Sequence, residues 1–256
     1  MGIESVTQCQ KMIPYNYIQT SPGSRVIVVG DIHGCWLELQ QLMDKIKFSD
    51  SDILITVGDF LDRGPDSWKI ARFIKDTGNV YSVIGNHERR VAGTIRGTSQ
   101  PAWSQKDTLS RIPSTEYVAW AEWLESLPAV IETPDVIVTH ARLNPSCPLN
   151  QQEVYHTVAV GGKSANITIG LDGIPSWFHN ITFAEKPICI GHIGYNNIEL
   201  VPKRLYALDT GVVSGGQLTA VVLPQFEIVQ VSASRNYYTE AYHAWKSKHD
   251  NQREKL

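Results

Sequence analysis

The sequence predicts an α/β fold built on a largely parallel β-sheet. Three observations lead to this: short apolar runs that end abruptly in glycine and polar residues, helical patterns between the first three runs, and strand-rich sequence after about Pro128. Continuous apolar, β-branched runs of this length suit strands that are covered on both faces. A strand-helix-strand-helix-strand order predicts parallel strands joined by helical crossovers.

The expected elements follow one another along the chain. Strands are expected at residues 26–29, 53–57, 80–84, 136–138, 188–190, 205–208, 217–222 and 226–231. Helices are expected over 36–46 and 66–75, because apolar residues recur there on one face. The stretches 93–113 and 142–177 are expected to be long loops, which often carry specificity. A terminal helix is expected from residue 235 onward.

Composition and charge narrow the class of protein. The chain has 256 residues, 42% of them hydrophobic, and a net charge of -3. We found no linker-like boundary, so one domain over 1–256 is expected, with its motifs within about 25–232 and a helical tail over about 235–256. The mild negative charge gives no electrostatic case for a nucleic acid or membrane partner. Four scattered cysteines without a C-x-x-C pair suggest a reduced, cytoplasmic protein.

Side chains that can bind metals follow the ends of the expected strands. They are Asp31, His33, Asp59, Asn86, His87, His140 and His192. Ligands of such sheets bind beyond the carboxyl ends of the strands. Each motif alone has an ordinary explanation as a turn or a helix cap. Because the motifs occur together, each at a strand end, a site for divalent transition metals is expected from the mixed nitrogen and oxygen donors.

Three of these blocks resemble the signature of phosphoprotein-phosphatase-type metallophosphoesterases. The blocks are Gly30-Asp31-x-His33-Gly34, Gly58-Asp59-x-x-Asp62-Arg63-Gly64 and Gly85-Asn86-His87-Glu88. The later His140, Gly191-His192 and Asp209-Thr210-Gly211 are similar to the small bacterial and phage branch, which includes diadenosine tetraphosphatases. The resemblance covers about residues 25–230. It implies a calcineurin-like fold in which two mixed β-sheets pack together and are flanked by helices.

The resemblance also implies two divalent metal ions, with manganese expected and iron or zinc as alternatives. Such ions clamp the phosphoryl oxygens and lower the pKa of a bridging water, which attacks phosphorus as hydroxide. No phosphoenzyme is then needed. The implied ligands are Asp31 and His33 for the first ion, Asp59 as the bridge, and Asn86, His140 and His192 for the second.

Further residues have implied catalytic roles. His87 would protonate the leaving alkoxide, oriented and kept cationic by Asp62. Arg63 would hold the phosphate oxygens with its planar guanidinium. Arg142 either binds phosphate as well or turns outward, and the phosphate role is slightly favoured. Residues 150–185 lack the aromatic-x-Arg element of many bacterial relatives, and Lys163 is the only lysine or arginine there.

Three functions remain open at this point. The first is a bacterial-type protein serine/threonine phosphatase, the second a dinucleoside polyphosphate hydrolase, and the third an inactive phosphate-binding module. The pair of Asp62 and Arg63 favours the first, since diadenosine tetraphosphatases of this branch usually lack that aspartate. The complete set of implied ligands disfavours the third. The expected substrate is a phosphorylated protein or a small phosphoester, and the oligomeric state stays open.

Overall fold

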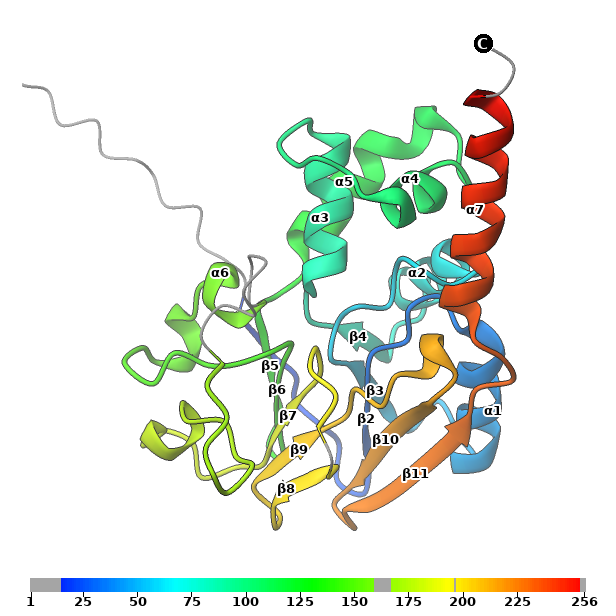
Figure 1. Ribbon diagram of the computed structural model, residues 1–256. Coiled ribbons are helices and arrows are strands. Elements are labelled where there is room, and N and C mark those ends of the chain that lie inside the picture. The colour runs from blue at the N-terminus through cyan, green and yellow to red at the C-terminus, as the bar shows by residue number, and fades with distance from the viewer. Residues whose placement is uncertain (1–14, 159–166, 196, 254–256) are drawn as a thin grey trace, which may run out of the picture.

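The computed structural model describes residues 15–158, 167–195 and 197–253, with side chains through Lys248. Two β-sheets face each other, and helices lie outside them and above one end (Figure 1). The predicted α/β architecture of two mixed, packed sheets flanked by helices is therefore confirmed. Within the described ranges, no helix is both long enough and apolar enough to cross a membrane.

The first sheet has five strands in the order β11-β10-β2-β3-β4. Its strands are β2 (Val26–Val29), β3 (Ile53–Thr56), β4 (Val80–Ser82), β10 (Gln217–Leu223) and β11 (Glu227–Ser232). Strands β2, β3 and β4 are parallel and are joined by α1 (Trp36–Ile46) and α2 (Ser67–Asp76), as the sequence predicts. Strand β10 pairs antiparallel with β2, and β11 with β10.

The second sheet has six strands in the order β1-β5-β6-β7-β9-β8. Its strands are β1 (Tyr15–Tyr17), β5 (Val130–Glu132), β6 (Ile137–Thr139), β7 (Ile188–Ile190), β8 (Glu199–Val201) and β9 (Leu205–Ala207). Strands β6, β7 and β9 are parallel to one another. The carboxyl ends of these three strands therefore lie at one edge of this sheet, as those of β2, β3 and β4 do in the other.

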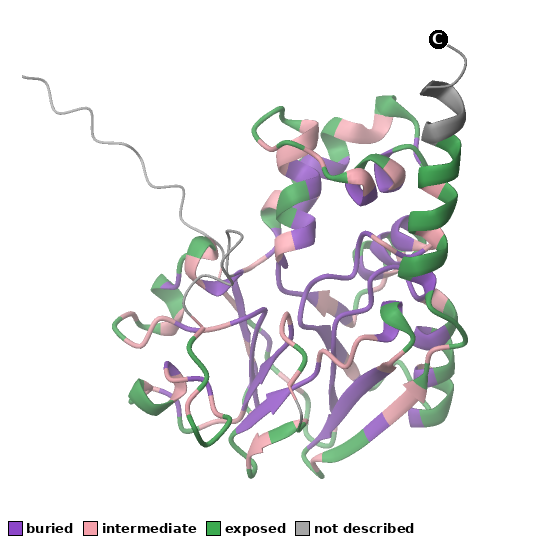
Figure 2. Ribbon diagram, in the orientation of Figure 1, coloured by how far each residue is buried: buried purple, intermediate pink, exposed green. Residues whose placement is uncertain are grey.

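Apolar side chains fill the space between the sheets and cover their outer faces. Val28, Ile55, Val138 and Cys189 belong to the cluster between the two sheets, and each is fully buried. A larger cluster joins the first sheet to the helices packed on it, and a third covers the outer face of the second sheet. Most strand residues are accordingly buried, whereas α7 (Tyr237–Arg253) is mostly exposed (Figure 2). This terminal helix confirms the sequence prediction.

Three helices lie above the carboxyl edge of the first sheet: α3 (Asn86–Ile95), α4 (Trp103–Leu109) and α5 (Tyr117–Ser126) (Figure 1). The expectation of a plain loop over 93–113 is therefore wrong, because α4 lies within it. Helix α4 lacks an apolar stripe, since it buries the polar side chains of Ser104, Gln105 and Thr108. The stretch 142–177 contains a further short helix, α6 (Val154–Thr157).

Candidate active site

The carboxyl edges of the two sheets meet, and the candidate ligands lie where they meet. Asp31 and His33 follow β2, Asp59 follows β3, and Asn86 begins α3 after β4; His140 follows β6, and His192 follows β7. Two contacts join the sheets at this point. The Nδ1 atom of His140 lies 2.7 Å from the Val57 carbonyl oxygen, and the His192 amide donates to both Asp31 carboxylate oxygens at 3.2 Å.

The backbone at this edge adopts positive φ angles at several residues and approaches neighbouring groups closely. Within the described part of the chain, eight non-glycine residues have a positive φ, and five of them are site residues: His33, Asp59, Asp62, Arg63 and His192. Side chains rarely adopt this conformation without a compensating gain, so it concentrates at functional sites. Gly191 permits the close approach of the sheets, because a Cβ there would lie 2.0 Å from Asp31 Oδ1.

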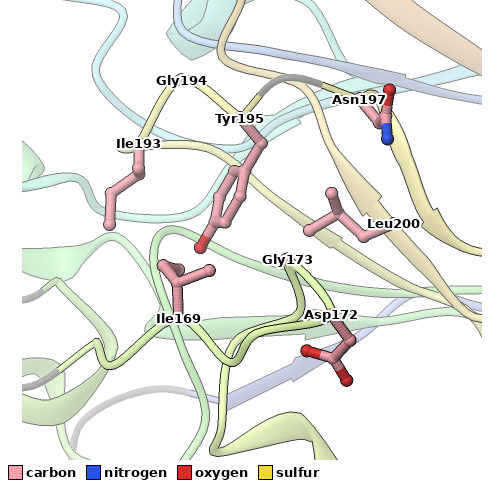
Figure 3. A pocket seen from close by; sticks show the side chains of 8 residues that line it. All are labelled: Ile169, Asp172, Gly173, Ile193, Gly194, Tyr195, Asn197 and Leu200. Carbon is pink, nitrogen blue, oxygen red and sulfur yellow. The ribbon is translucent and has the colours of Figure 1, made fainter.

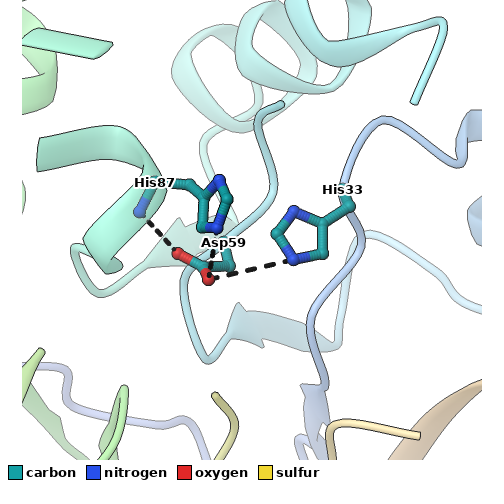
Figure 4. Close-up of side chains that lie close together, drawn as sticks. All are labelled: His33, Asp59 and His87. Carbon is teal, nitrogen blue, oxygen red and sulfur yellow. Dashed lines mark hydrogen bonds and ion pairs between the residues drawn. The ribbon is translucent and has the colours of Figure 1, made fainter. Parts of the chain in front are cut away.

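Two groups of potential metal-binding atoms share the Asp59 carboxylate. In the first group, the ligand atoms of His33, Asp59 and His87 lie within 4.8 Å of one another (Figure 4). In the second, those of Asp59, His140 and His192 do. A carboxylate common to both groups fits the bridging position that the sequence analysis assigned to it. His87, expected to be an acid, also directs Nε2 at this centre, 3.9 Å from Asp59 Oδ2.

The imidazole rings are oriented by hydrogen bonds on the side away from the centre. The Nδ1 atom of His33 donates to the Leu61 carbonyl at 2.9 Å, and that of His140 donates to Val57. Each bond directs the other ring nitrogen, Nε2, toward Asp59, at 3.8 Å and 3.4 Å respectively. Metal-binding histidines are commonly held in this way by a second partner.

Asn86 links the second group. Its side-chain oxygen lies 2.9 Å from His140 Nε2 and 2.8 Å from His192 Nδ1. An amide oxygen placed between two imidazole nitrogens completes a mixed nitrogen and oxygen donor set, without any thiolate. Such a set suits manganese, iron or zinc.

The electrostatics of the buried site favour a bound cation. Burial and the Arg63 charge lower the pKa of His33 to about 3, and burial and His140 lower that of His192 to about 4. Both rings are therefore neutral at pH 7, as metal ligands must be. Burial alone would lower the pKa of His140, but the charges of Asp59 and Asp31 raise it to about 10. The carboxylates thus stabilise positive charge where a metal ion would bind.

Next to this centre lies a buried pair of His87 and Asp62. The His87 Nδ1 donates to Asp62 Oδ2 at 2.7 Å, so its Nε2 remains free to face a substrate. Burial is the largest single influence and would raise the pKa of Asp62, but the bond to His87, the charges of His87 and His33 and the bond from the Arg63 amide together lower the pKa to about 2. The carboxylate therefore stays ionised and can stabilise a protonated His87, as the role of acid requires.

Helix α4 surrounds the Asp62 carboxylate with hydrogen-bond donors. Ser104 Oγ and Thr108 Oγ1 each donate to it at 3.1 Å, and the Gln105 side-chain amide also donates. Because Asp62 is fully buried, its charge depends on these partners as well as on His87. The segment expected to be a loop therefore supplies part of the candidate catalytic machinery.

The predicted phosphate-binding side chains differ in their surroundings. Arg63 Nη1 lies 3.0 Å from His33 Nε2, so this guanidinium reaches the candidate metal centre. It also lies over the ring of Tyr238 on α7, 5.8 Å from the ring centroid. Arg142 Nε donates to the His156 carbonyl of α6 at 2.8 Å, and its role with phosphate stays a prediction. Lys163 lies outside the described residues.

Glu88, which the sequence analysis named only as part of the third motif, holds the site together. Its buried carboxylate accepts hydrogen bonds from the backbone amides of Gly85, Asp59 and Leu61 at 2.8–2.9 Å. A glutamate at the fourth position of the Gly-Asn-His-Glu motif, the third residue of helix α3, was the available signal. Asp209, after β9, was assigned no role, yet after burial its charge is the main cause that raises the pKa of nearby Asp31.

Replacing Glu88 with alanine is expected to destabilise the fold by at least about 3 kcal/mol. The change leaves three buried amides unpaired, and each such group costs ~1–3 kcal/mol. Urea unfolding of the variant measures the loss. Glu122→Ala, on the exposed face of α5, is the matched control and should change stability by less than about 0.5 kcal/mol. Equal stability of Glu88→Ala and the unmodified chain would contradict this role.

A family model described as calcineurin-like phosphoesterase matches residues 24–219. The chain belongs to the calcineurin-like phosphoesterase family. The match contains every candidate ligand and most strands of both sheets; β1 and β11 lie outside it. The protein is therefore a metallophosphoesterase, a hydrolase that uses divalent metal ions.

Several relatives share a more specific description. A symmetrical bis(5'-nucleosyl)-tetraphosphatase of Erwinia tasmaniensis is 31% identical over 62% of this chain and 57% of its own length. That of Pasteurella multocida is 24% identical over 82% of this chain and 98% of its own. Three further proteins of this description, from Photorhabdus laumondii, Proteus mirabilis and Haemophilus ducreyi, are matched over 44–47% of their own length.

Solved structures share the fold. The crystal structure of a candidate diadenosine tetraphosphatase superposes with a TM-score of 0.65, at 27% identity, over 86% of this chain and 98% of that one. A Saccharomyces cerevisiae serine/threonine phosphatase similar to human PP5 gives a TM-score of 0.59 at 18% identity, over 86% and 83% of the chains. At that identity the second likeness concerns the fold alone.

The residues present fit the metal ions of this family. Asp31, His33, Asp59, Asn86, His140 and His192 would hold them. Bound ions lower the pKa of a coordinated water and polarise phosphoryl oxygens. The chain's own contributions are the neutral imidazoles of His33 and His192, the buried carboxylates that offset the cationic charge, the Arg63 guanidinium, and the proton that Asp62 stabilises on His87.

Proposed function

We propose that the protein is a dinucleoside polyphosphate hydrolase that cleaves symmetrically, releasing nucleoside diphosphates. The observation that carries this is the shared description of the Erwinia and Pasteurella relatives, together with the likeness to the candidate diadenosine tetraphosphatase structure. The site is compatible, because a phosphate chain can place one inner phosphoryl group at the metal centre while Arg63 binds oxygens of the neighbouring phosphate, and the bridging oxygen leaves with the second nucleoside diphosphate. These relatives favour the second function of the sequence analysis over the first.

Manganese is the metal we propose. The donor set of imidazoles, carboxylates and one amide contains no soft ligand, which suits manganese better than a metal that prefers thiolates. Iron and zinc remain alternatives with the same ligands.

One observation favours hydrolysis of phosphorylated proteins as a second candidate function. A serine alkoxide is a poor leaving group and needs a proton, whereas a nucleoside diphosphate leaves as a stabilised anion. The buried pair of His87 and Asp62 would supply that proton, with their 2.7 Å bond and three α4 donors around the carboxylate. An enzyme restricted to dinucleotides has less need of this arrangement.

Side-by-side hydrolysis of diadenosine tetraphosphate and a phosphoserine peptide with manganese tests the proposal. We expect the dinucleotide to be the better substrate by kcat/KM, with ADP as its product. Release of phosphate from the peptide alone would overturn the proposed substrate and support the second candidate. Hydrolysis of neither, by a protein that binds manganese, would contradict both.

A further inference from the structure

Arg63 supplies positive charge at the candidate metal centre. Its Nη1 atom lies 3.0 Å from His33 Nε2, and among the described residues no other lysine or arginine bonds a candidate metal ligand. The cavity beyond the turn that carries His192 adds no such charge (Figure 3). Its described lining contains no lysine or arginine, and its Asp172 carboxylate lies 3.0 Å from His179 Nε2. Of the described cations, Arg63 is therefore the one placed to bind phosphate oxygens.

The backbone of Arg63 is held in place, but the backbone alone leaves the long side chain free to move. The residue has a φ of +70°, and its amide donates to Asp62 Oδ1 at 2.9 Å. An arginine side chain loses much rotamer freedom when it is held in one position. A neighbour that already holds the guanidinium where it binds phosphate removes part of this cost from binding.

The ring of Tyr238 on α7 is the second contact of this guanidinium. Arg63 Cζ lies over the ring, 5.8 Å from its centroid. A guanidinium within about 6 Å of a ring centroid is attracted to the negative face of the ring. This contact uses none of the N–H groups of the guanidinium. Tyr238 can therefore hold Arg63 without competing with phosphate for its hydrogen-bond donors.

The preceding residue anchors α7 where Tyr238 reaches Arg63. Tyr237 is buried, and its hydroxyl donates to the Glu38 carboxylate of α1 at 2.9 Å and 3.1 Å. The Ser234 amide donates to the same carboxylate at 2.9 Å. Glu38 is fully buried, so these donors satisfy a carboxyl group that water does not reach. The first turn of α7 is thus fixed to α1, and Tyr238 is fixed with it.

Helix α4 gives the Tyr238 ring a further support. The ring centroid of Trp103 lies 5.5 Å from that of Tyr238 and 5.4 Å from that of Tyr242, about one turn further along α7. Helices α4 and α7 pack side by side (Figure 1). The two tyrosines are each 38% exposed and contact the same indole, but Arg63 lies over the ring of Tyr238. The pair therefore separates contact with Arg63 from packing between the helices.

We propose that Tyr238 is a positioning residue for phosphate binding, whose ring holds the Arg63 guanidinium at the metal centre. It acts through Arg63 and gives the terminal helix a part in a site otherwise built from segments that follow the strands. The inference goes beyond the proposed function, because the phosphate group is common to dinucleotides and phosphoproteins. It holds for either candidate substrate.

Binding of inorganic phosphate to the manganese-loaded protein, measured by calorimetry, tests this role without turnover. We expect Tyr238→Ala to weaken binding about fivefold, equivalent to about 1 kcal/mol. Tyr238→Phe keeps the ring and should restore binding to within about twofold of the unmodified chain. Tyr242→Ala is the matched control, because it removes an equally exposed ring from Trp103. It should leave phosphate binding unchanged, and urea unfolding should show similar stability for the two alanine variants.

The same substitution in an Arg63→Ala background shows whether Tyr238 acts through Arg63. Arg63→Ala alone should weaken phosphate binding about 10-fold or more. Adding Tyr238→Ala should then cause less than about a twofold further loss, because no guanidinium remains to be positioned. A fivefold loss in both backgrounds, or an equal loss in Tyr242→Ala, would show a general effect of α7 and overturn the inference. Unchanged binding by Tyr238→Ala or by Arg63→Ala would overturn it as well.

Steady-state hydrolysis of p-nitrophenyl phosphate gives a second measurement. Tyr238→Ala should raise KM about fivefold and change kcat less, because the ring helps to bind the phosphate group. Equal changes of KM in Tyr238→Ala and Tyr242→Ala would contradict the role.

These outcomes are separate from the test of the proposed function. A protein that couples Tyr238 to Arg63 but cleaves no dinucleotide keeps the positioning role and loses the proposed substrate. A protein that cleaves the dinucleotide without this coupling keeps the function and loses the positioning role.

Discussion

Replacing Asp59 with asparagine is expected to lower turnover of any phosphoester by several powers of ten. Its carboxylate is shared by both groups of metal-binding atoms, so losing its charge weakens both positions. The change is conservative in shape. The His87 backbone amide donates a hydrogen bond to Asp59 Oδ1 at 2.9 Å, and the side-chain oxygen of an asparagine can accept the same bond. Steady-state rates with saturating manganese measure the loss.

Asp50→Asn provides the matched control for this experiment. Asp50 is an exposed residue before β3, at the opposite end of the strand from Asp59. The control should keep full activity and the same manganese dependence. Near-normal turnover by Asp59→Asn would show that the site lies elsewhere, whereas a loss in both variants would indicate a general effect on the fold.

The His87→Asn variant should lose activity in proportion to how poor the leaving group is. A general acid contributes about 10²–10⁴-fold when an alkoxide departs. For p-nitrophenyl phosphate the leaving group is already stable as an anion, so the loss should be much smaller. Comparing a phosphoserine peptide or an alkyl phosphate with this activated ester measures the difference.

The alternative role of His87 gives a different result. Its Nε2 also lies within the first group of potential ligand atoms. If His87 bound the metal instead of donating a proton, both substrates would lose activity equally and manganese affinity would fall. His243→Asn, on the exposed side of α7, serves as the control and should leave both rates unchanged.

Much of the fold is predictable because its apolar patterns are local. The helix expected at 36–46 is observed with the same bounds, since Leu39, Leu42 and Ile46 form one buried face. The candidate ligands can also be predicted from the sequence, because each one follows an apolar run that forms a buried strand. Strand ends that meet at one edge bring residues as distant as Asp31 and His192 together. Their roles as ligands stay predictions.

The rest depends on contacts that no local pattern reveals. Helix α4 was missed because most of its buried side chains are polar and bond the Asp62 carboxylate, while Leu109 packs in the apolar core. Strands β1 and β8 have three residues each and are partly exposed, so their sequences lack a strong pattern. Glu88 can accept the amide hydrogen bonds of Asp59 and Leu61 only when α3, which carries it, packs beside the loop that follows β3.

Anomalous diffraction from crystals grown with manganese tests the central claim most directly. Two peaks are expected on either side of the Asp59 carboxylate, about 3.5–4 Å apart as in other two-metal sites. Asp31 and His33 should bind one ion, and Asn86, His140 and His192 the other. A single peak, or peaks away from Asp59, would contradict a two-metal centre at the meeting edges of the two sheets.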